Sequence, residues 1–428
     1  MSVKLGKLSR SVSIIGVGCT PFTDIMTHPK TKGLTEGELF GWAALEAMND
    51  AGVEAKDVDM YFHGQGSAAQ FSDYITPNAQ VANWFGMRGK AAVHHSEACC
   101  TGYLALDLAV NAVASGKHNI VLSGCIEITG SVAAPGKPAH MRRPISFLDI
   151  MAGMPTLYDR AYTRQLEAGL SNAIDDVAAD YCRQYGLTDD QMDDVLNALA
   201  INHRRSSARN PLALHQKEYK ETAKEAGFDD PMKYLKSDSF NPRMGEYLRA
   251  SGFEARCDGA GAVIVCPTEM AKQFKQQPIE VLGIGTALLE GSQPHLEKRA
   301  TAEAIRQVYE LTGVKPAEID LLMANDFFIT SGLLAAELSG YIPAGEGWKY
   351  ILDGRTSYDG DKPINSNGGR TAFGHAFAAS GLADCYEAVK QMRRQCGDHQ
   401  VRKLPETVML RGFGGGQNLT AGIIRTVQ

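Results

Sequence analysis

The chain has 428 residues, of which 44% are hydrophobic and 21% are charged, as is usual for a globular protein. Lysine and arginine total 43 against 49 aspartates and glutamates, so the formal net charge is −6 and a nucleic-acid-binding protein is not indicated. The length exceeds the size at which one hydrophobic core normally stops growing. We therefore expect two core modules with insertions.

No apolar run approaches the roughly 18 residues needed to cross a bilayer, and the N-terminal segment lacks an apolar stretch followed by a signal-peptide cleavage site. The nine cysteines are scattered without CxxC spacing, and their number is odd. This pattern favours neither a disulfide framework nor a zinc site. We expect a protein of the reducing cytoplasm that binds no metal.

Two segments in different halves of the chain share one pattern. Residues 12–18 (VSIIGVG) and 279–285 (IEVLGIG) are apolar strands that end in glycine, and an amphipathic helix follows each. Further along, the Gly-Val pairs at 52–53 and 313–314 are each followed, at the same distance, by an aliphatic residue and aspartate. This repetition predicts an α/β fold with a duplicated αβαβα layering, in which helices pack between and outside two mixed sheets.

Between the halves the composition changes to a region rich in charge, Met and Asn. We expect an N-terminal half at 1–125, completed by about 251–275, a loop domain at 126–250 that is a functional insertion, and a C-terminal half at 276–428. The loop domain holds two basic clusters that suit the phosphates of a nucleotide, although such clusters are more often simply solvated surface. Their candidate phosphate ligands are Arg142, Arg143, His203, Arg204 and Arg205.

Cys99 lies at the start of a predicted helix, in the segment ACCTGYLALDLAV. Backbone N–H groups and the positive end of the helix dipole favour a thiolate there, which would make Cys99 a nucleophile. A buried, inert core cysteine is the alternative.

Three further segments carry candidate chemistry. His375 lies in a loop of small residues, NSNGGRTAFGHAFAASG, where imidazole is suited to proton transfer, although a lone histidine is usually structural. Asn325 and Asp326 follow the strand-like IDLLM, at the carboxyl end of a strand or in a simple turn. The glycines of GFGGGQN (412–418) are able to present N–H groups to an oxyanion.

These four elements, in this order and over essentially the whole chain, resemble the thiolase superfamily. The resemblance implies that Cys99 is the nucleophile, that His375 withdraws its proton, and that Asn325 positions a water or donates toward the enolate oxygen. It further implies an oxyanion hole formed by the N–H of the nucleophile and that of the glycine loop, at Gly415. DGAGAVIV (258–265) and the region around 197–211 resemble the branch of sterol-carrier-protein-type thiolases, acetyl-CoA acetyltransferases and their bacterial relatives.

The sequence also departs from that family. Thiolases carry a second cysteine, an acid–base group, at the head of the glycine loop, where this chain has Gly412; sterol-carrier-type relatives supply it from a motif in which this chain has Phe327. Ala376 replaces the proline after the loop histidine. The proton transfer that this second cysteine performs is then left to His375 itself, to Cys100, to Asp326 or to a nearby tyrosine.

The resemblance implies CoA-dependent cleavage of a 3-oxoacyl-CoA through an acyl-Cys99 intermediate, or the reverse Claisen condensation, with coenzyme A as co-substrate and no bound cofactor. The missing cysteines point to an unusual substrate of a degradation pathway, aromatic or branched, such as benzoylsuccinyl-CoA. A thiolase-fold aldolase or C-acyltransferase and a noncatalytic acyl-CoA-binding subunit are the alternatives. The implied partners are a second copy of the chain, as a homodimer or dimer of dimers, and a small subunit with an OB-fold and a zinc ribbon. The resemblance also implies that the loop domain covers CoA and the substrate, which makes its basic residues candidate CoA-phosphate ligands.

Overall fold

The computed structural model describes residues 4–25, 27–66, 76–128, 170–288, 296–414 and 418–427. Within those ranges no helix has the length and apolar character needed to cross a membrane. The strands are β1 (Val12–Cys19), β2 (Met60–Gly64), β3 (Ala91–His95), β4 (Val121–Ile128), β5 (Asp258–Pro267), β6 (Ile279–Leu288), β7 (Leu321–Ala324), β8 (Thr407–Gly414) and β9 (Asn418–Thr426).

The helices of the N-terminal part are α1 (Glu36–Ala51), α3 (Pro77–Val81) and α4 (Thr101–Ala114). The middle of the chain forms α6 (Leu170–Tyr185), α7 (Asp189–Ser207), α8 (Tyr219–Glu225), α9 (Pro231–Leu235) and α10 (Thr268–Ala271). The C-terminal part forms α11 (Leu296–Thr312), α12 (Ile329–Leu338), α13 (Gly347–Leu352), α14 (Gly369–Ala372) and α15 (Phe377–Met392).

The described strands form one sheet in the order β3-β2-β4-β5-β1-β6-β9-β8-β7. The two halves repeat the same pairing. In the first half, β1 pairs antiparallel with β5, β5 pairs antiparallel with β4, and β4 pairs in parallel with β2. In the second half, β6 pairs antiparallel with β9, β9 pairs antiparallel with β8, and β8 pairs in parallel with β7. The halves join where residues 12–14 of β1 pair with 279–281 of β6. The expected two sheets are therefore continuous, because their first strands share this short antiparallel contact.

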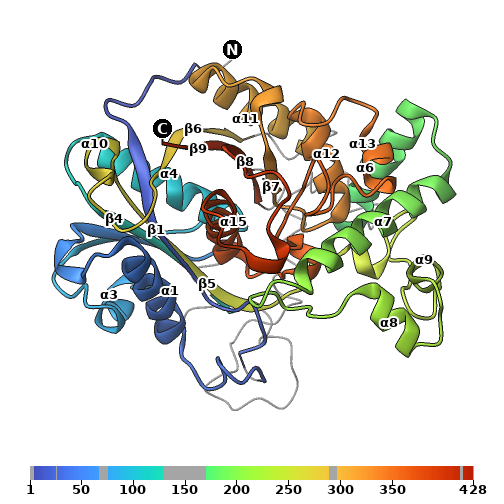
Figure 1. The fold of residues 1–428 in the computed structure, drawn as a ribbon, viewed down its shortest axis with the longest axis horizontal. Helices are drawn as coiled ribbons and strands as arrows, with labels where there is room; N and C mark the ends of the chain where they lie inside the picture. Colours follow the sequence, from blue (N-terminus) through green and yellow to red (C-terminus); the bar gives the residue numbers. More distant parts are fainter. Residues whose placement is uncertain are drawn as a thin grey trace, which may run out of the picture.

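Helices cover both outer faces and fill the space between the halves (Figure 1). On β5, Val263 and Val265 point to the core that includes α4 and α15, whereas Ala262 and Ile264 point to the core that includes α1, as the alternation of a strand requires. In the other half, α11 packs on β6 and β9. The layers thus run α, β, α, β, α, with α4 and α15 in the middle.

The segment from α6 to α9 packs on the C-terminal half of the molecule (Figure 1). Leu196 and Leu199 of α7 belong to the same buried cluster as Phe327 and Leu333. The Tyr181 hydroxyl donates to the Glu337 carboxylate at 2.5 Å, which ties α6 to α12. The segment from α6 to α9 is therefore anchored beside the end of β7, which Asn325 directly follows.

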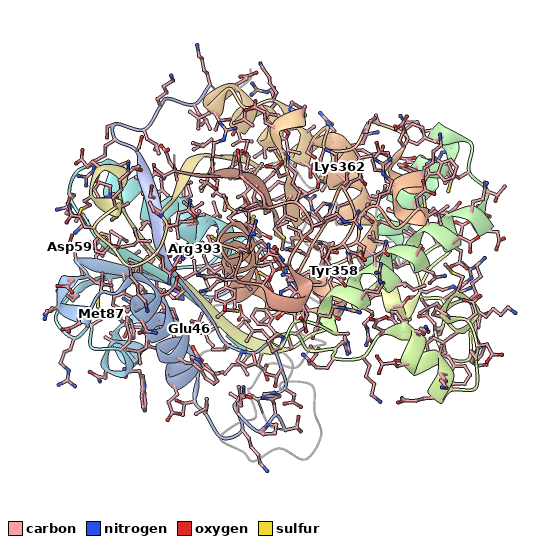
Figure 2. All side chains as sticks on the ribbon, viewed as in Figure 1. Glu46, Asp59, Met87, Tyr358, Lys362 and Arg393 are labelled. Atoms are coloured by element: carbon pink, nitrogen blue, oxygen red, sulfur yellow. The ribbon has the colours of Figure 1, made fainter. Side chains whose placement is uncertain are left out.

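A buried ion pair fastens α15 to the outer helix α1. The Arg393 guanidinium, just after α15, donates to the Asp50 carboxylate at 2.8 Å and to the Ile15 carbonyl of β1 at 3.4 Å. Pairing of β1 with β6 has ended at residue 14, and Ile15 lies at a register shift in the pairing of β1 with β5. Arg393 provides a donor to the Ile15 carbonyl at this irregular point. Figure 2 labels Arg393 and Glu46, a residue of α1 on the same side of the molecule.

The two central helices touch through glycine. A Cβ atom added at Gly102 of α4 would lie 2.4 Å from the Ala378 carbonyl oxygen and 2.8 Å from the Cα of Gly381, both in α15. Such distances are far below van der Waals contact, so only glycine lets the two backbones approach this closely. The contact brings the N-terminal ends of both helices together.

We predict that Gly102→Ala lowers the free energy of unfolding by about 1–3 kcal/mol, because the added methyl group must push α4 away from α15. Urea unfolding followed by circular dichroism measures this effect. The matched control is Gly332→Ala in α12, where the nearest atom to an added Cβ is 3.5 Å away. That substitution should stabilise the protein by up to about 1 kcal/mol through helix propensity; equal effects of the two substitutions would contradict the prediction.

Candidate active site

The centre of the candidate site is a contact between Cys99 and His375, residues separated by most of the chain. Cys99 lies two residues before α4, and its Sγ is 3.1 Å from His375 Nε2. The residue before it, Ala98, has a φ of 48°, which is uncommon for a residue with a side chain. This turn ahead of α4 presents the thiol to the imidazole.

His375 is held from both sides of its ring and by its backbone. Its Nδ1 lies 3.0 Å from the Ser380 hydroxyl, in the first turn of α15. Its backbone N–H donates to the Ala255 carbonyl at 2.7 Å, and its own carbonyl accepts from the Cys257 N–H at 3.3 Å. With Nδ1 engaged by Ser380, the Nε2 atom is left to face Cys99, which is the arrangement needed to accept the thiol proton.

A carboxyl group that sequence reasoning missed, that of Glu254, also contacts His375. Its Oε2 lies 3.3 Å from His375 Nε2, and its Oε1 accepts from Arg256 Nε at 2.9 Å. The only available signal was an acidic side chain among small residues just before the strand DGAGAVIV. That signal is weak in a single sequence, because nothing local indicates that residues 254–257 lie against His375.

The electrostatics of the site keep both partners neutral. Burial raises the pKa of Cys99 well above that of a free thiol, and Glu254 in its ionised form raises it further, while Arg370 lowers it. Burial also lowers the pKa of His375 well below that of a free imidazole, and Arg370 and Arg256 act in the same direction. Desolvation of the sulfur therefore opposes the effect of the helix N-terminus, which favours the thiolate.

A buried network supports the loop of His375. The Arg370 guanidinium donates to both oxygens of Asp384, at 3.0 and 2.6 Å, and to the Ser380 carbonyl at 3.2 Å. The Tyr103 hydroxyl of α4 donates to the same carboxylate. Because this network joins α4 to α15 and to Ser380, it fixes the residue that orients the imidazole.

The same tyrosine explains why a cysteine is absent from the head of the glycine loop. A Cβ atom at Gly412 would lie 2.5 Å from Cδ2 of Tyr103 and 2.3 Å from Oγ1 of Thr420. The space that a side chain at position 412 requires is already filled. A second acid–base group must therefore come from elsewhere.

Asn325 joins the end of β7 to the end of β8. Its Nδ2 donates to the Phe413 carbonyl at 2.9 Å, and its Oδ1 accepts from the Phe327 N–H at 3.2 Å. An asparagine amide has two N–H donors, so one remains for a water or a ligand. Phe413 leads toward the glycine loop, whose Gly415 lies outside the described residues.

Two other candidates for the second proton face away from Cys99. The Cys100 thiol lies 3.6 Å from the Thr420 hydroxyl in β9, and burial raises its pKa to about 12. The Asp326 carboxylate accepts from the Arg370 backbone N–H at 2.8 Å and lies 3.5 Å from His203 Nδ1. It therefore faces α7 and α14. Phe327 is buried against aromatic rings and offers no acid–base group.

The basic candidates of the inserted segment are mostly occupied. His203 is buried beside Asp326, so it is not available to a phosphate at the surface. Arg205 pairs with Asp359 at 2.7 Å, and Arg204 stacks over the ring of Tyr219. Tyr358, labelled in Figure 2, receives the guanidinium of Arg205 on its ring face.

Arg142 and Arg143 lie outside the described residues.

In the described part of the chain, one cluster of potential metal ligands occurs: Glu387, Cys396 and His399, all buried, with ligand atoms within 4.8 Å of one another. The Glu387 carboxylate already accepts from Ser366 and pairs with His399. This cluster is accounted for as a buried hydrogen-bonded ion pair at the end of α15.

Comparison with known proteins gives this geometry a context. The chain is 31% identical to the acetyl-CoA acetyltransferase of Methanothermobacter thermautotrophicus, covering 95% of this chain and 97% of that protein. It is 28% identical to the benzoylsuccinyl-CoA thiolase subunit BbsB of Thauera aromatica, covering 96% of each. Its fold is similar to that of the Ltp2-ChsH2(DUF35) aldolase, with a TM-score of 0.75 at 20% identity over 98% of this chain and 99% of that one.

Two family models match the chain along most of its length. The thiolase N-terminal domain matches residues 12–269, and the thiolase C-terminal domain-like model matches residues 288–424. The first model contains Cys99 and Glu254, and the second contains Asn325 and His375. Together with the duplicated sheet and the contact of Cys99 with His375, these matches establish that the chain belongs to the thiolase family.

Proposed function

We propose that this chain, a thiolase-type acyltransferase, cleaves a 3-oxoacyl-CoA with coenzyme A, or runs the reverse Claisen condensation, through an acyl-Cys99 intermediate. The observation that carries the proposal is the 3.1 Å contact of Cys99 Sγ with a buried, neutral His375. A neutral imidazole at hydrogen-bond distance is able to take the thiol proton as the sulfur attacks.

In the proposed reaction, the Cys99 proton moves to His375 Nε2 and the sulfur adds to the keto carbon of the substrate. The carbon–carbon bond then breaks, leaving an acyl group on Cys99 and an acyl-CoA enolate. Coenzyme A attacks the acyl group and restores the free cysteine. The N–H groups of Cys99 and Gly415 are the proposed donors to the oxyanion, and the free N–H of Asn325 is the proposed donor that positions a water or binds the enolate oxygen.

For the substrate we propose an aromatic or branched 3-oxoacyl-CoA. The similarity to the benzoylsuccinyl-CoA thiolase subunit BbsB supports this choice, as does the loss of the cysteine at positions 412 and 327. Steady-state kinetics with acetoacetyl-CoA and benzoylsuccinyl-CoA test it. A preference for acetoacetyl-CoA would contradict it.

The Cys99 geometry favours acyl transfer over the two alternatives. Retro-aldol cleavage needs no acyl-cysteine, so an aldolase has no use for a thiol placed against a neutral imidazole. A noncatalytic subunit would likewise need neither the contact nor the support of the imidazole by Ser380.

The proposed partners are a second copy of the chain and a small OB-fold zinc-ribbon subunit. β3 ends the sheet and has no neighbour on its outer side among the described strands, and its Val93 is 46% exposed. Such an edge is a template for pairing. The relative BbsB is named a subunit, which supports a companion protein. We propose that this companion completes the CoA entrance. Arg142 and Arg143 remain proposed ligands of the CoA phosphates. Full turnover by the purified chain alone would contradict the small subunit.

We predict that incubation with mass-tagged acetyl-CoA leaves an acetyl group on the peptide that contains Cys99. His375→Asn should slow formation of this adduct by about 10²–10⁴-fold, since the general base is lost. Cys99→Ser should abolish the adduct at this peptide, whereas Cys100→Ser should leave it in place because that thiol faces Thr420. Peptide mass spectrometry measures all three, and an adduct on any cysteine but Cys99 would refute the assignment.

The pKa directions predict how free Cys99 responds to pH. Because its folded pKa is raised above that of an ordinary thiol, the thiolate fraction is small at neutral pH and grows about tenfold per pH unit below that pKa. Alkylation of the Cys99 peptide by iodoacetamide should therefore accelerate steadily from pH 6 to pH 9. A rate that is constant over this range would instead indicate a preformed thiolate–imidazolium pair.

We predict that Val93→Lys converts a dimer into monomers, because a charge on the exposed edge of β3 opposes strand pairing between copies. Analytical ultracentrifugation measures the change. Leu352→Lys is the matched control, since Leu352 is an aliphatic side chain of similar exposure, 42%, at the end of α13. A variant at position 93 that stays dimeric would remove β3 from the interface.

A further inference from the structure

The Glu254 carboxyl and the Cys99 thiol meet at one atom. Both contact Nε2 of His375, Glu254 at 3.3 Å and Cys99 at 3.1 Å. The other oxygen of Glu254 is held by Arg256, at 2.9 Å. Arg256 therefore fixes the carboxyl so that Oε2 is turned toward the reacting pair.

The proposed reaction moves two protons, and His375 accounts for only one of them. It takes and returns the proton of Cys99, while the enolate carbon and the CoA thiol need a second group. Tyr103 and Thr420 fill the space beside Gly412, and the side chains of Cys100 and Asp326 face away from the thiol. Among the residues that the structure describes, Glu254 places a carboxyl within 3.3 Å of His375 Nε2, against this pair.

His375, Cys99 and Glu254 differ in their exposure to solvent. His375 is completely buried, whereas Cys99 is partly exposed and the Glu254 side chain keeps 11% of its surface. A substrate is thus able to touch the sulfur and the carboxyl while the imidazole stays behind them. This is the placement that proton transfer to a substrate atom requires.

We propose that Glu254 is the second acid–base residue of the site, in place of the missing cysteine; this inference rests on the proposed function. When the carbon–carbon bond breaks, its electron pair passes to the α-carbon, and the Glu254 carboxyl gives that carbon a proton. The resulting carboxylate then takes the proton of the CoA thiol, whose sulfur attacks the acyl group. The Cys99 thiolate leaves and recovers its proton from His375, so every group returns to its starting state.

The charges of the acyl-enzyme fit this cycle. After the first half-reaction His375 carries a proton and Glu254 has lost one, so an imidazolium and a carboxylate stand 3.3 Å apart and stabilise each other. Burial raises the pKa of Glu254, and the charges of Arg256 and Arg370 partly offset this effect. A carboxyl that holds its proton closer to neutral pH is suited to act as an acid in one step and as a base in the next.

The test separates acylation from proton transfer to carbon. Acylation is followed with S-(4-nitrophenyl) thioacetate, whose leaving thiolate needs no proton, by the release of nitrothiophenolate and the mass of the Cys99 peptide. Proton transfer is followed on the pre-acetylated protein as deuterium uptake into the methyl group of acetyl-CoA in D₂O. For Glu254→Gln we expect deuterium uptake to fall about 10²–10⁴-fold, with acylation as fast as in the wild type or faster.

Two variants complete the design. Glu254→Cys puts a thiol in place of the carboxyl, and its rate of deuterium uptake should be at least about tenfold higher than that of Glu254→Gln. A purely structural role of Glu254 would not produce this recovery. Glu387→Gln is the matched control: it makes the same change beside another buried histidine, His399, outside the site. It should leave both rates unchanged, with folding checked by circular dichroism.

Each result has one meaning. Loss of deuterium uptake with intact acylation supports the proposal. An equal loss of both rates would show that Glu254 only orients His375, and no loss of either would show that it is not used; both outcomes overturn the proposal. Absence of an adduct on Cys99 in the wild-type protein would instead overturn the proposed function itself.

Discussion

The close approach of α4 and α15 is the constraint on which the site depends. Gly102 and Gly381 let the two backbones touch in the middle layer, and the reacting groups lie just ahead of the two helices. Cys99 belongs to the first half of the duplicated fold and His375 to the second, so neither half contains the site alone. A shift of α4 against α15 by the width of a methyl group would separate the sulfur from the imidazole by more than a hydrogen bond tolerates.

Burial determines the chemistry at this meeting point. A thiol and an imidazole in water differ modestly in acidity, but desolvation moves their pKa values in opposite directions and leaves both groups neutral. In the proposed reaction, charge then develops as the sulfur attacks the substrate. The neighbouring cations are fixed beforehand: Arg370 is held by Asp384 and Arg256 by Glu254, so they need little reorganisation when the charges appear.

The departures from the family pattern form one connected change. Tyr103 fills the space beside Gly412 and also donates to the carboxylate that holds Arg370. The same network reaches Ser380, which supports His375. A residue that excludes the usual cysteine thus also stabilises the loop of the histidine, and the segment at 254–257 pairs with that loop and carries a carboxyl to the same ring.

The amino-acid sequence by itself determined the family, the duplicated layering and the candidates Cys99, Asn325 and His375, because motifs and strand periodicity are local properties of the chain. It could not show that the sheet is continuous, since that depends on a three-residue contact of β1 with β6. It also could not show how strongly the Cys99 sulfur is desolvated, because desolvation depends on residues distant in sequence. His203, taken for a phosphate ligand, is buried beside Asp326, and Glu254 was overlooked for the same reason: only the folded chain brings residues 254–257 against residue 375, and only that proximity gives the carboxyl a chemical role.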